Sequence, residues 1–347
     1  MLKKRLLLLL RPHAFILLTF LLMTISCAYA DTTFTNQPKV QKFIHEMVKK
    51  HHFNKNQLIT LFNKVKVHPI VIQHVKKPLE KKPWYTYQLL FVNEWRIEHG
   101  VKFWNKYEQV LREAEKKYKV PASIIVATIG IESQYGTKTG EHRVIDALTN
   151  IGFSDSERAP YFRYELEQFL LLTREKKLDP LKVTGSYAGA IGQPQFMPSS
   201  YRRYAIDFSK KGKVDLTHDT VDVIGSIANY YAKQGWNHEE PVVQETQIIS
   251  SRFDYLLKKN KIKPPFTIHQ LVKNGVLPKG NIPRNKAITG KTKVKMIELE
   301  NRHGKEYWLA FHNFNVIKRY NASDTYAMAV YQLSHYIKEL RSRLNNG

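Results

Sequence analysis

Cysteine is almost absent from this chain of 347 residues, which contains only Cys27. A single thiol cannot form a disulfide within the chain, so a disulfide framework is excluded. If the first thirty residues are removed, thiol chemistry is excluded as well. We also find no internal repeat and no low-complexity tract. The remaining chain of about 317 residues is long enough for two or three units that share a large core.

A membrane-spanning run is also missing at the N-terminus. The apolar stretch Ala14 to Ile25 has twelve residues, too few to cross a bilayer. It follows a basic segment, residues 3–11, and precedes the small residues of Ala28-Tyr29-Ala30. This layout predicts a cleaved signal peptide over residues 1–30 and a periplasmic protein. The alternative is an outer-membrane lipoprotein anchored through Cys27.

Acidic residues are few relative to basic ones, with 30 Asp and Glu against 55 Lys and Arg and a formal charge of +25. Removal of the signal peptide and its four charges leaves +21. Such an excess attracts polyanions. For an exported chain these are the cell wall and anionic membrane surfaces. The lysines are scattered and no nucleic-acid-binding module is recognised, so we expect no nucleic acid partner. A solvated basic surface is the simpler alternative.

Periodicity predicts an α+β fold that is mainly α. Residues 38–118 show helical spacing interrupted by prolines, and residues 120–240 have few strand signals. The final segment is helical again, with Ser323 or Asp324 as its cap. Its predicted apolar stripe consists of Tyr326, Ala329, Val330, Leu333 and Tyr336. Between these helical parts the sequence predicts short strands in the runs Val242 to Ile249, Val294 to Leu299 and Tyr307 to Phe314.

Glu132 is the first candidate for chemistry. It ends a run from Ala122 that is apolar on almost every side, which predicts a buried helix with Pro121 at its start and Gly136 as its stop. Apolar neighbours and the negative end of the helix dipole both favour the protonated carboxyl, as a general acid requires. The alternative is a glutamate at a fraying helix end.

A second segment, Gly185 to Tyr201, combines small residues, amides, hydroxyls and aromatics. Such a composition lets backbone approach a ligand closely while amides and rings face it. A tight structural loop before a helix would look the same.

Together the two segments resemble the membrane-bound lytic murein transglycosylase B family. Further matches follow in the same order and with compatible spacing, so the resemblance covers about residues 83 to 335. The matching stretches are Ile131 to Gly136, Gly185 to Tyr201, Pro83 to Tyr87, Ile224 to Tyr231, and Arg319 to Ser323 with Tyr326 to Val330.

The resemblance implies a lysozyme-like catalytic core over residues 119–240. Around this core it implies an N-terminal helical domain over residues 31–118, completed by the C-terminal helix 320–347. A small β-rich domain would cover residues 241–319. We expect a monomer.

The resemblance also implies the chemistry. The family cuts between N-acetylmuramic acid and N-acetylglucosamine and leaves 1,6-anhydromuramyl ends, with one glutamate as acid and base. Glu132 matches that glutamate, and Ser186 and Asn321 match residues that orient the acetamido group of the substrate. Other residues match substrate-binding positions, namely Gln195, Tyr87, Tyr230, Tyr326, Phe196 and Tyr320. The polymer bound would be the glycan strand of peptidoglycan.

Two alternatives stay open. A water-using muramidase on the same fold would need a second carboxylate, for which the candidates are Glu141, Asp146, Asp155 and Glu157. A non-catalytic peptidoglycan-binding or scaffolding protein is the other alternative, although it would have no need for the acid.

One segment departs from the family. Asp207 to Asp215 resembles its calcium loop, with Asp207, Ser209 and Gly212 at the first, third and sixth positions. Lys211 occupies the fifth, where a carboxylate should bind the ion. We therefore predict no metal and no cofactor.

Overall fold

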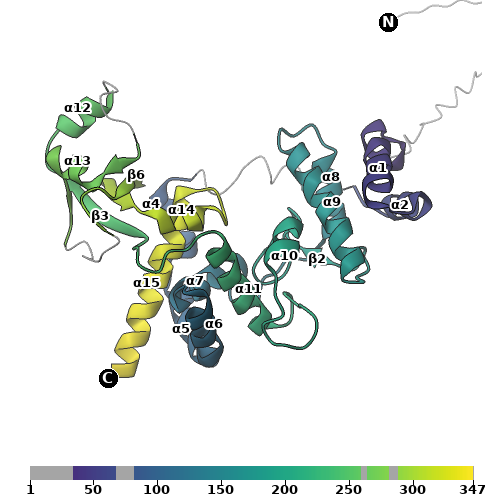
Figure 1. Ribbon diagram of the computed structural model, residues 1–347, viewed down its shortest axis with the longest axis horizontal. Helices are drawn as coiled ribbons and strands as arrows, with labels where there is room; N and C mark the ends of the chain where they lie inside the picture. The colour runs from purple at the N-terminus through teal and green to yellow at the C-terminus, as the bar shows by residue number, and fades with distance from the viewer. Residues whose placement is uncertain (1–33, 68–81, 259–263, 281–287, 347) are drawn as a thin grey trace, which may run out of the picture.

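The computed structural model describes residues 34–67, 82–258, 264–280 and 288–346 (Figure 1). The predicted signal peptide and Cys27 lie outside these residues. Within them, no helix combines the length and apolar character needed to cross a membrane.

Helices make up most of the described chain, which confirms the predicted mainly helical α+β class. After a short 3-10 turn at Phe34–Asn36, the helices before the sheet are α1 (Pro38–His51), α2 (Lys55–Phe62), α4 (Trp84–Phe91), α5 (Glu94–Lys106), α6 (Glu108–Tyr118), α7 (Ala122–Ser133), α8 (Val144–Gly152), α9 (Ala159–Glu175), α10 (Pro198–Tyr204) and α11 (Thr220–Lys233). Those that follow are α12 (Arg252–Lys258), α13 (Ile268–Lys273), α14 (His312–Lys318) and α15 (Asp324–Asn346).

The strands form two antiparallel sheets. The smaller one pairs β1 with β2, and the larger one has the order β4-β6-β7-β3-β5. Its longest ladder runs between β6 and β7, with Ile297 opposite Trp308. The strands are β1 (His142–Arg143), β2 (Thr184–Gly185), β3 (Val243–Ile248), β4 (Phe266–Thr267), β5 (Val276–Pro278), β6 (Lys293–Asn301) and β7 (Gly304–Ala310).

The large sheet has its own small apolar cluster. Phe253, Val276 and Leu309 are almost fully buried in it, apart from the main core. The main core runs through the helical part and includes α7, α11 and α15. Figure 1 shows the green sheet region beyond the upper end of α15, with α5, α6, α7 and α11 beside that helix.

The helices before residue 119 lie in two places. α1 packs on α9, since the ring of His51 and the ammonium of Lys50 both contact the Glu167 carboxylate at 2.7 and 3.4 Å. α4, α5 and α6 lie instead near α7 and α15 (Figure 1). The division into an N-terminal helical domain, a catalytic core and a β-rich domain therefore stays a proposal.

Two details of the predicted elements were wrong. The run Tyr307 to Phe314 is a strand only to Ala310, because Phe311 is the N-cap of α14. Tyr336 is 39% exposed, whereas Ile337 is fully buried. Three turns of 3.6 residues span about eleven positions, so the residue on the same face as Tyr326 is Ile337 and not Tyr336.

Candidate active site

Glu132 is the only residue of α7 that is not buried. The three residues that share its face at helical spacing, Ile125, Thr128 and Ile129, are 0% exposed. The predicted buried helix is therefore confirmed, and Glu132 lies where its last turn reaches the surface. A carboxylate in this place borders the apolar core on one side and a ligand or solvent on the other.

The helix ends earlier than the sequence predicted. The stop is Gln134 rather than Gly136, since φ is 50° at Gln134, 60° at Tyr135 and 87° at Gly136. Left-handed backbone is disfavoured for residues with a Cβ, so packing must hold this turn. The Oγ of Ser133 accepts the N–H of Gly136 at 3.0 Å, which closes the turn directly after Glu132.

Tyr135 provides that packing. Its ring fills a slot between two helices, where a Cβ on Gly130 would come within 2.6 Å of the phenol and one on Gly100 within 2.7 Å. Its hydroxyl donates to the carbonyl of Arg96 at 2.5 Å. Burial raises the pKa of Tyr135, so the phenol stays protonated as a donor. The ring thus joins α5 to the turn that follows Glu132.

The carboxylate of Glu132 accepts a hydrogen bond from Tyr326. The hydroxyl lies 2.5 Å from Oε1, and the ring belongs to the first turn of α15 and is 2% exposed. Burial, with the nearby Glu132 carboxylate as a second cause, raises the pKa of Tyr326 well above its usual value. The phenol is therefore a neutral donor over the whole working pH range.

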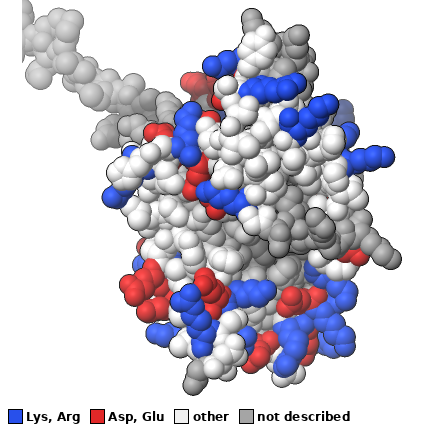
Figure 2. All heavy atoms as spheres, turned by 90° about the vertical axis from the view of Figure 1, so that its left-hand side faces the viewer, with Lys and Arg blue, Asp and Glu red and all other residues white. Residues whose placement is uncertain are grey.

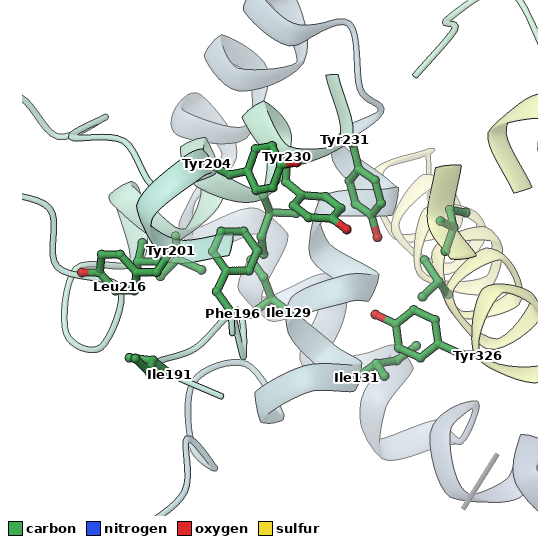
Figure 3. Packing of buried hydrophobic residues seen from close by; sticks show 14 of the residues in the cluster. Ile129, Ile131, Ile191, Phe196, Tyr201, Tyr204, Leu216, Tyr230, Tyr231 and Tyr326 are labelled. Carbon is green, nitrogen blue, oxygen red and sulfur yellow. The ribbon is translucent and has the colours of Figure 1, made fainter. Parts of the chain in front are cut away.

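Three predicted site residues form a connected aromatic group with Tyr326. Tyr320 stacks on it with ring centroids 6.4 Å apart and contacts Tyr230 at 4.8 Å. Phe196 lies 5.6 Å from Tyr230 and 5.7 Å from Tyr320. Figure 3 shows Phe196 and Tyr230 grouped together, with Tyr326 opposite them from the C-terminal helix. Four predicted residues from distant parts of the sequence are thus brought together in one aromatic group, and Tyr326 of this group binds Glu132.

Hydrogen bonds fix this aromatic group. Tyr230 donates to the carbonyl of Arg319 and Tyr320 to that of Pro194, each at 2.5 Å. Phe196, Tyr230 and Tyr326 are at most 5% exposed. Their rings have little surface to stack on a sugar, so their part in the site is to hold the elements around Glu132. Tyr320 is partly exposed and retains a surface that a ligand can contact.

Tyr87 lies in the core on α4, 1% exposed, with its ring near those of Trp84 and Phe91. This geometry leaves no ring face for a sugar. The ring of Tyr87 is therefore part of the hydrophobic core, and only its hydroxyl could contact a ligand.

The motif Gly185 to Tyr201 forms a tight loop that leads into α10. At Gly185 a Cβ would lie 2.1 Å from the carbonyl oxygen of Ala190, so a larger residue does not fit. Ser186 Oγ accepts the N–H groups of Ala188 and Ala190 at 3.2 and 3.0 Å. Both bonds use oxygen lone pairs, so the hydroxyl hydrogen can be donated to a ligand.

The side-chain amide of Gln195 is oriented within this loop. It donates to the carbonyls of Thr139 and Gly192 at 2.9 and 2.8 Å, and its backbone is left-handed with φ of 50°. Asn321 is partly exposed and directly follows Tyr320. Ser323 and not Asn321 caps α15, since its Oγ accepts the N–H of Tyr326 at 3.3 Å.

Glu165 was not singled out from the sequence. It is 1% exposed on α9, and its two oxygens accept the N–H and Oγ–H of Ser199 at 2.9 and 2.7 Å. Burial raises its pKa, against the hydrogen bonds from Ser199 and Tyr161. The carboxyl therefore holds the first turn of α10, which directly follows the motif loop. Nothing in the sequence indicated that Arg96 and Glu165 support the site, because each lies in an ordinary amphipathic stretch.

The candidate second carboxylates have other contacts or surroundings. Asp146 is 2% exposed, and it accepts two hydrogen bonds from Arg143 and one from the N–H of Lys66. Asp155 pairs with Lys39 at 3.2 Å on the surface. Glu141 and Glu157 are exposed.

A partly exposed carboxyl that ends a buried helix and accepts a hydrogen bond from a buried phenol is placed to exchange a proton with a bound ligand. The chain belongs to the transglycosylase SLT family, whose domain model matches residues 35–335. It is 37% identical to membrane-bound lytic murein transglycosylase B of Escherichia coli K12 over 314 residues, which is 88% of this chain and 84% of that protein. It is an enzyme of the lytic transglycosylase class, which degrades peptidoglycan.

Solved structures agree with this fold. The soluble lytic transglycosylase SltB1 of Pseudomonas aeruginosa is 41% identical with a TM-score of 0.78 and covers 88% of this chain and 100% of its own. The Escherichia coli Slt35 structure in complex with calcium has 36% identity, a TM-score of 0.78, and coverage of 89% and 95%. SltB3 of Pseudomonas aeruginosa with NAG-NAM-pentapeptide has 26% identity, a TM-score of 0.74, and coverage of 86% and 79%. The predicted lysozyme-like fold is confirmed.

Proposed function

We propose that this lytic murein transglycosylase cleaves the β-1,4 bond between N-acetylmuramic acid and N-acetylglucosamine without water. The bond from muramyl C1 to the leaving O4 breaks, and O4 takes the proton of Glu132. The muramyl O6 then bonds to C1 and returns its proton to the same carboxylate. Atoms balance with no second reactant, and the product ends in a 1,6-anhydromuramyl unit.

The observation that carries this proposal is that Glu132, the one residue of α7 that is not buried, accepts a hydrogen bond from the Tyr326 hydroxyl. One group that gives and then takes a proton needs a stable, oriented carboxyl. Tyr326 favours the ionised form by its hydrogen bond, while the apolar helix favours the protonated form. The two effects oppose each other, as suits a group that must act in both states.

Substrate contacts are proposed for the loop beside it. Ser186 has a hydroxyl hydrogen to donate, and Asn321 follows the partly exposed Tyr320. We assign both to the acetamido group of the muramyl sugar, which would stabilise the positive C1. Gln195 has its amide nitrogen fixed by two carbonyls, which leaves the amide oxygen to accept from a sugar hydroxyl.

The muramidase alternative requires a carboxylate that activates water or attacks C1. Asp146 is the buried candidate, and its oxygens already accept from Arg143 and Lys66. The scaffold alternative requires no acid, yet Glu132 interrupts an otherwise buried helix at a cost in desolvation. Neither alternative has an observation in its favour.

The setting that we propose is the periplasm. The protein would reach it through a signal peptide, or remain attached through Cys27, and would bind peptidoglycan as a monomer. Figure 2 shows Lys and Arg spread over one face, with Asp and Glu among them in its lower half. A distributed excess of positive charge suits attraction to an extended anionic wall better than to one docking point.

The test is Glu132→Gln, which keeps the shape and removes the transferable proton. Turnover of purified sacculi should fall at least about a hundredfold, as expected for loss of a general acid. Glu141→Gln, an exposed change of the same kind, should leave turnover unchanged. Near-normal activity of Glu132→Gln would exclude Glu132 as the acid.

Product mass separates the two reactions independently. Each wild-type product that carries a new muramyl end should be lighter by one water than the corresponding product of hydrolysis. A hydrolytic product would support the muramidase, and loss of activity in Glu141→Gln would identify its second carboxylate.

A further inference from the structure

The loop between α10 and α11 has the outline of a calcium site but not the ligands. In such a loop a carboxylate stands at the fifth position and a bidentate glutamate at the twelfth. Counted from Asp207, these positions hold Lys211 and His218. The His218 ring lies 3.2 Å from the Asp215 carboxylate. Within the described part of the chain, no group of three or more His, Cys, Asp or Glu is arranged to hold a metal. The residues present do not fit calcium.

The carboxylates of the loop nevertheless converge. Asp207 accepts the N–H groups of Lys211 and Gly212 at 2.9 and 2.7 Å. Asp222 is 0% exposed and accepts those of Ser209 and Asp215 at 2.9 and 3.0 Å. Backbone donors fix the turn, but they leave the negative charges of both side chains without a full counter-charge.

Lys211 supplies a positive charge at this point. Its Nζ lies 2.6 Å from Oδ2 of Asp219, whose side chain is 11% exposed. A hydrogen bond to Asp219 and then attraction to that carboxylate raise the pKa of Lys211, and Asp222 and Asp207 add smaller effects of the same sign. The side chain of Lys211, 66% exposed, is therefore paired through its ammonium with Asp219, while the backbone N–H of the same residue binds Asp207.

Asp219 connects the loop to the helix that carries Tyr230. Its Oδ1 accepts the N–H of Val221 at 3.0 Å as the N-cap of α11, while Oδ2 pairs with Lys211. The same carboxylate thus caps the helix and binds the cation. A metal ion in a calcium loop performs the same task when it joins loop oxygens to the following helix.

We propose that the ammonium of Lys211 is the resident cation of this loop, taking the place of a divalent metal and joining the loop to α11 without one. This inference does not depend on the proposed reaction. It predicts that the folded enzyme is independent of calcium. It also predicts that the loop regains a need for a cation when Lys211 is changed.

The experiment measures thermal unfolding and calcium titration of the mature protein. The wild type should have the same Tm in about 10 mM calcium as in chelator, because calcium raises Tm only if it binds the native state. Lys211→Asp combined with His218→Glu restores the fifth and twelfth ligands. This double variant should bind calcium with a dissociation constant of about 10⁻⁴ to 10⁻³ M, as extracellular loops do. At about 10 mM calcium this corresponds to a rise in Tm of about 2–4 °C.

Lys211→Met removes the ammonium and keeps most of the stem, so its Tm should fall in chelator. Lys213→Met is the matched control, because it removes an exposed charge from the same loop, and its Tm should stay near that of the wild type. Three results would overturn the proposal: a calcium-dependent Tm in the wild type, equal Tm values for the two Met variants, or a folded Lys211→Asp/His218→Glu protein that binds no calcium. If this double variant does not fold, the two Met variants decide.

Discussion

Tyr326→Phe removes one hydroxyl from a ring that is 2% exposed. The ring stacked on Tyr320 stays, and a change this small is tolerated by a packed core. The lost group is the donor that lies 2.5 Å from Oε1 of Glu132. The variant therefore tests one interaction of the proposed acid and leaves the fold in place.

The size of the effect follows from that contact. Because Tyr326 keeps its proton, its hydrogen bond favours the ionised form of Glu132. A hydrogen bond to a charged group contributes about 1.5–3 kcal/mol, and one pH unit corresponds to about 1.4 kcal/mol. Since the proposed first step needs the proton of Glu132, removing a donor that favours its ionised form should move the alkaline limb of the rate profile to higher pH, by about 1–2 pH units.

The assay follows kcat/KM for release of soluble muropeptides from sacculi between about pH 5 and 9, where such limbs are observed. Tyr331→Phe is the matched control, because Tyr331 lies on the same helix and contacts Trp308 instead. Its profile should coincide with that of the wild type. An alkaline limb at the same pH in Tyr326→Phe and the wild type would refute the reasoning.

Three further outcomes are expected. Gly130→Ala places a Cβ 2.6 Å from the phenol of Tyr135, so it should destabilise the chain by about 1–3 kcal/mol in denaturant unfolding. The double variant with Tyr135→Ala should lose less stability than the sum of the losses in the two single variants, because the clash is then absent. The raised pKa of Glu165 means that the folded chain holds this proton more tightly than the unfolded chain. The stability that the protonated Glu165 contributes is complete below the pKa of the unfolded chain and is lost as pH rises through the pKa of the folded chain. Glu165→Gln should therefore flatten the decline of Tm between about pH 4 and 8. Parallel declines of Tm in the variant and the wild type would contradict this. Raising salt from about 0.05 to 0.5 M should weaken sacculus binding and raise KM much more than it lowers the saturated rate, and an equal fall of both would place the charge effect inside the site.

The sequence by itself determined the class of this protein and indicated the residue that we propose as its acid. The run from Ala122 to Ile131 is apolar on almost every side, which predicted a buried helix, and Glu132 was conspicuous as the carboxyl that follows it. The motif Gly185 to Tyr201 indicated a segment that approaches a ligand or a tight loop, and the structure shows a tight loop in which a Cβ at Gly185 would lie 2.1 Å from the carbonyl oxygen of Ala190. Both conclusions rest on local physics: the period of a helix and the volume of a side chain.

Only the tertiary structure decided which groups meet at Glu132. Tyr326 lies 194 positions further along the chain, and no spacing rule joins residues so far apart. The same holds for the end of α7, where the left-handed Gln134 replaces the expected stop at Gly136 because Tyr135 is held between α5 and α7. For Lys211, the sequence predicted one property and the tertiary structure decided another. Its position in the loop predicted that calcium would not bind, but its place beside Asp219 depends on how the chain folds back, since long-range packing and not local sequence brings those charges together.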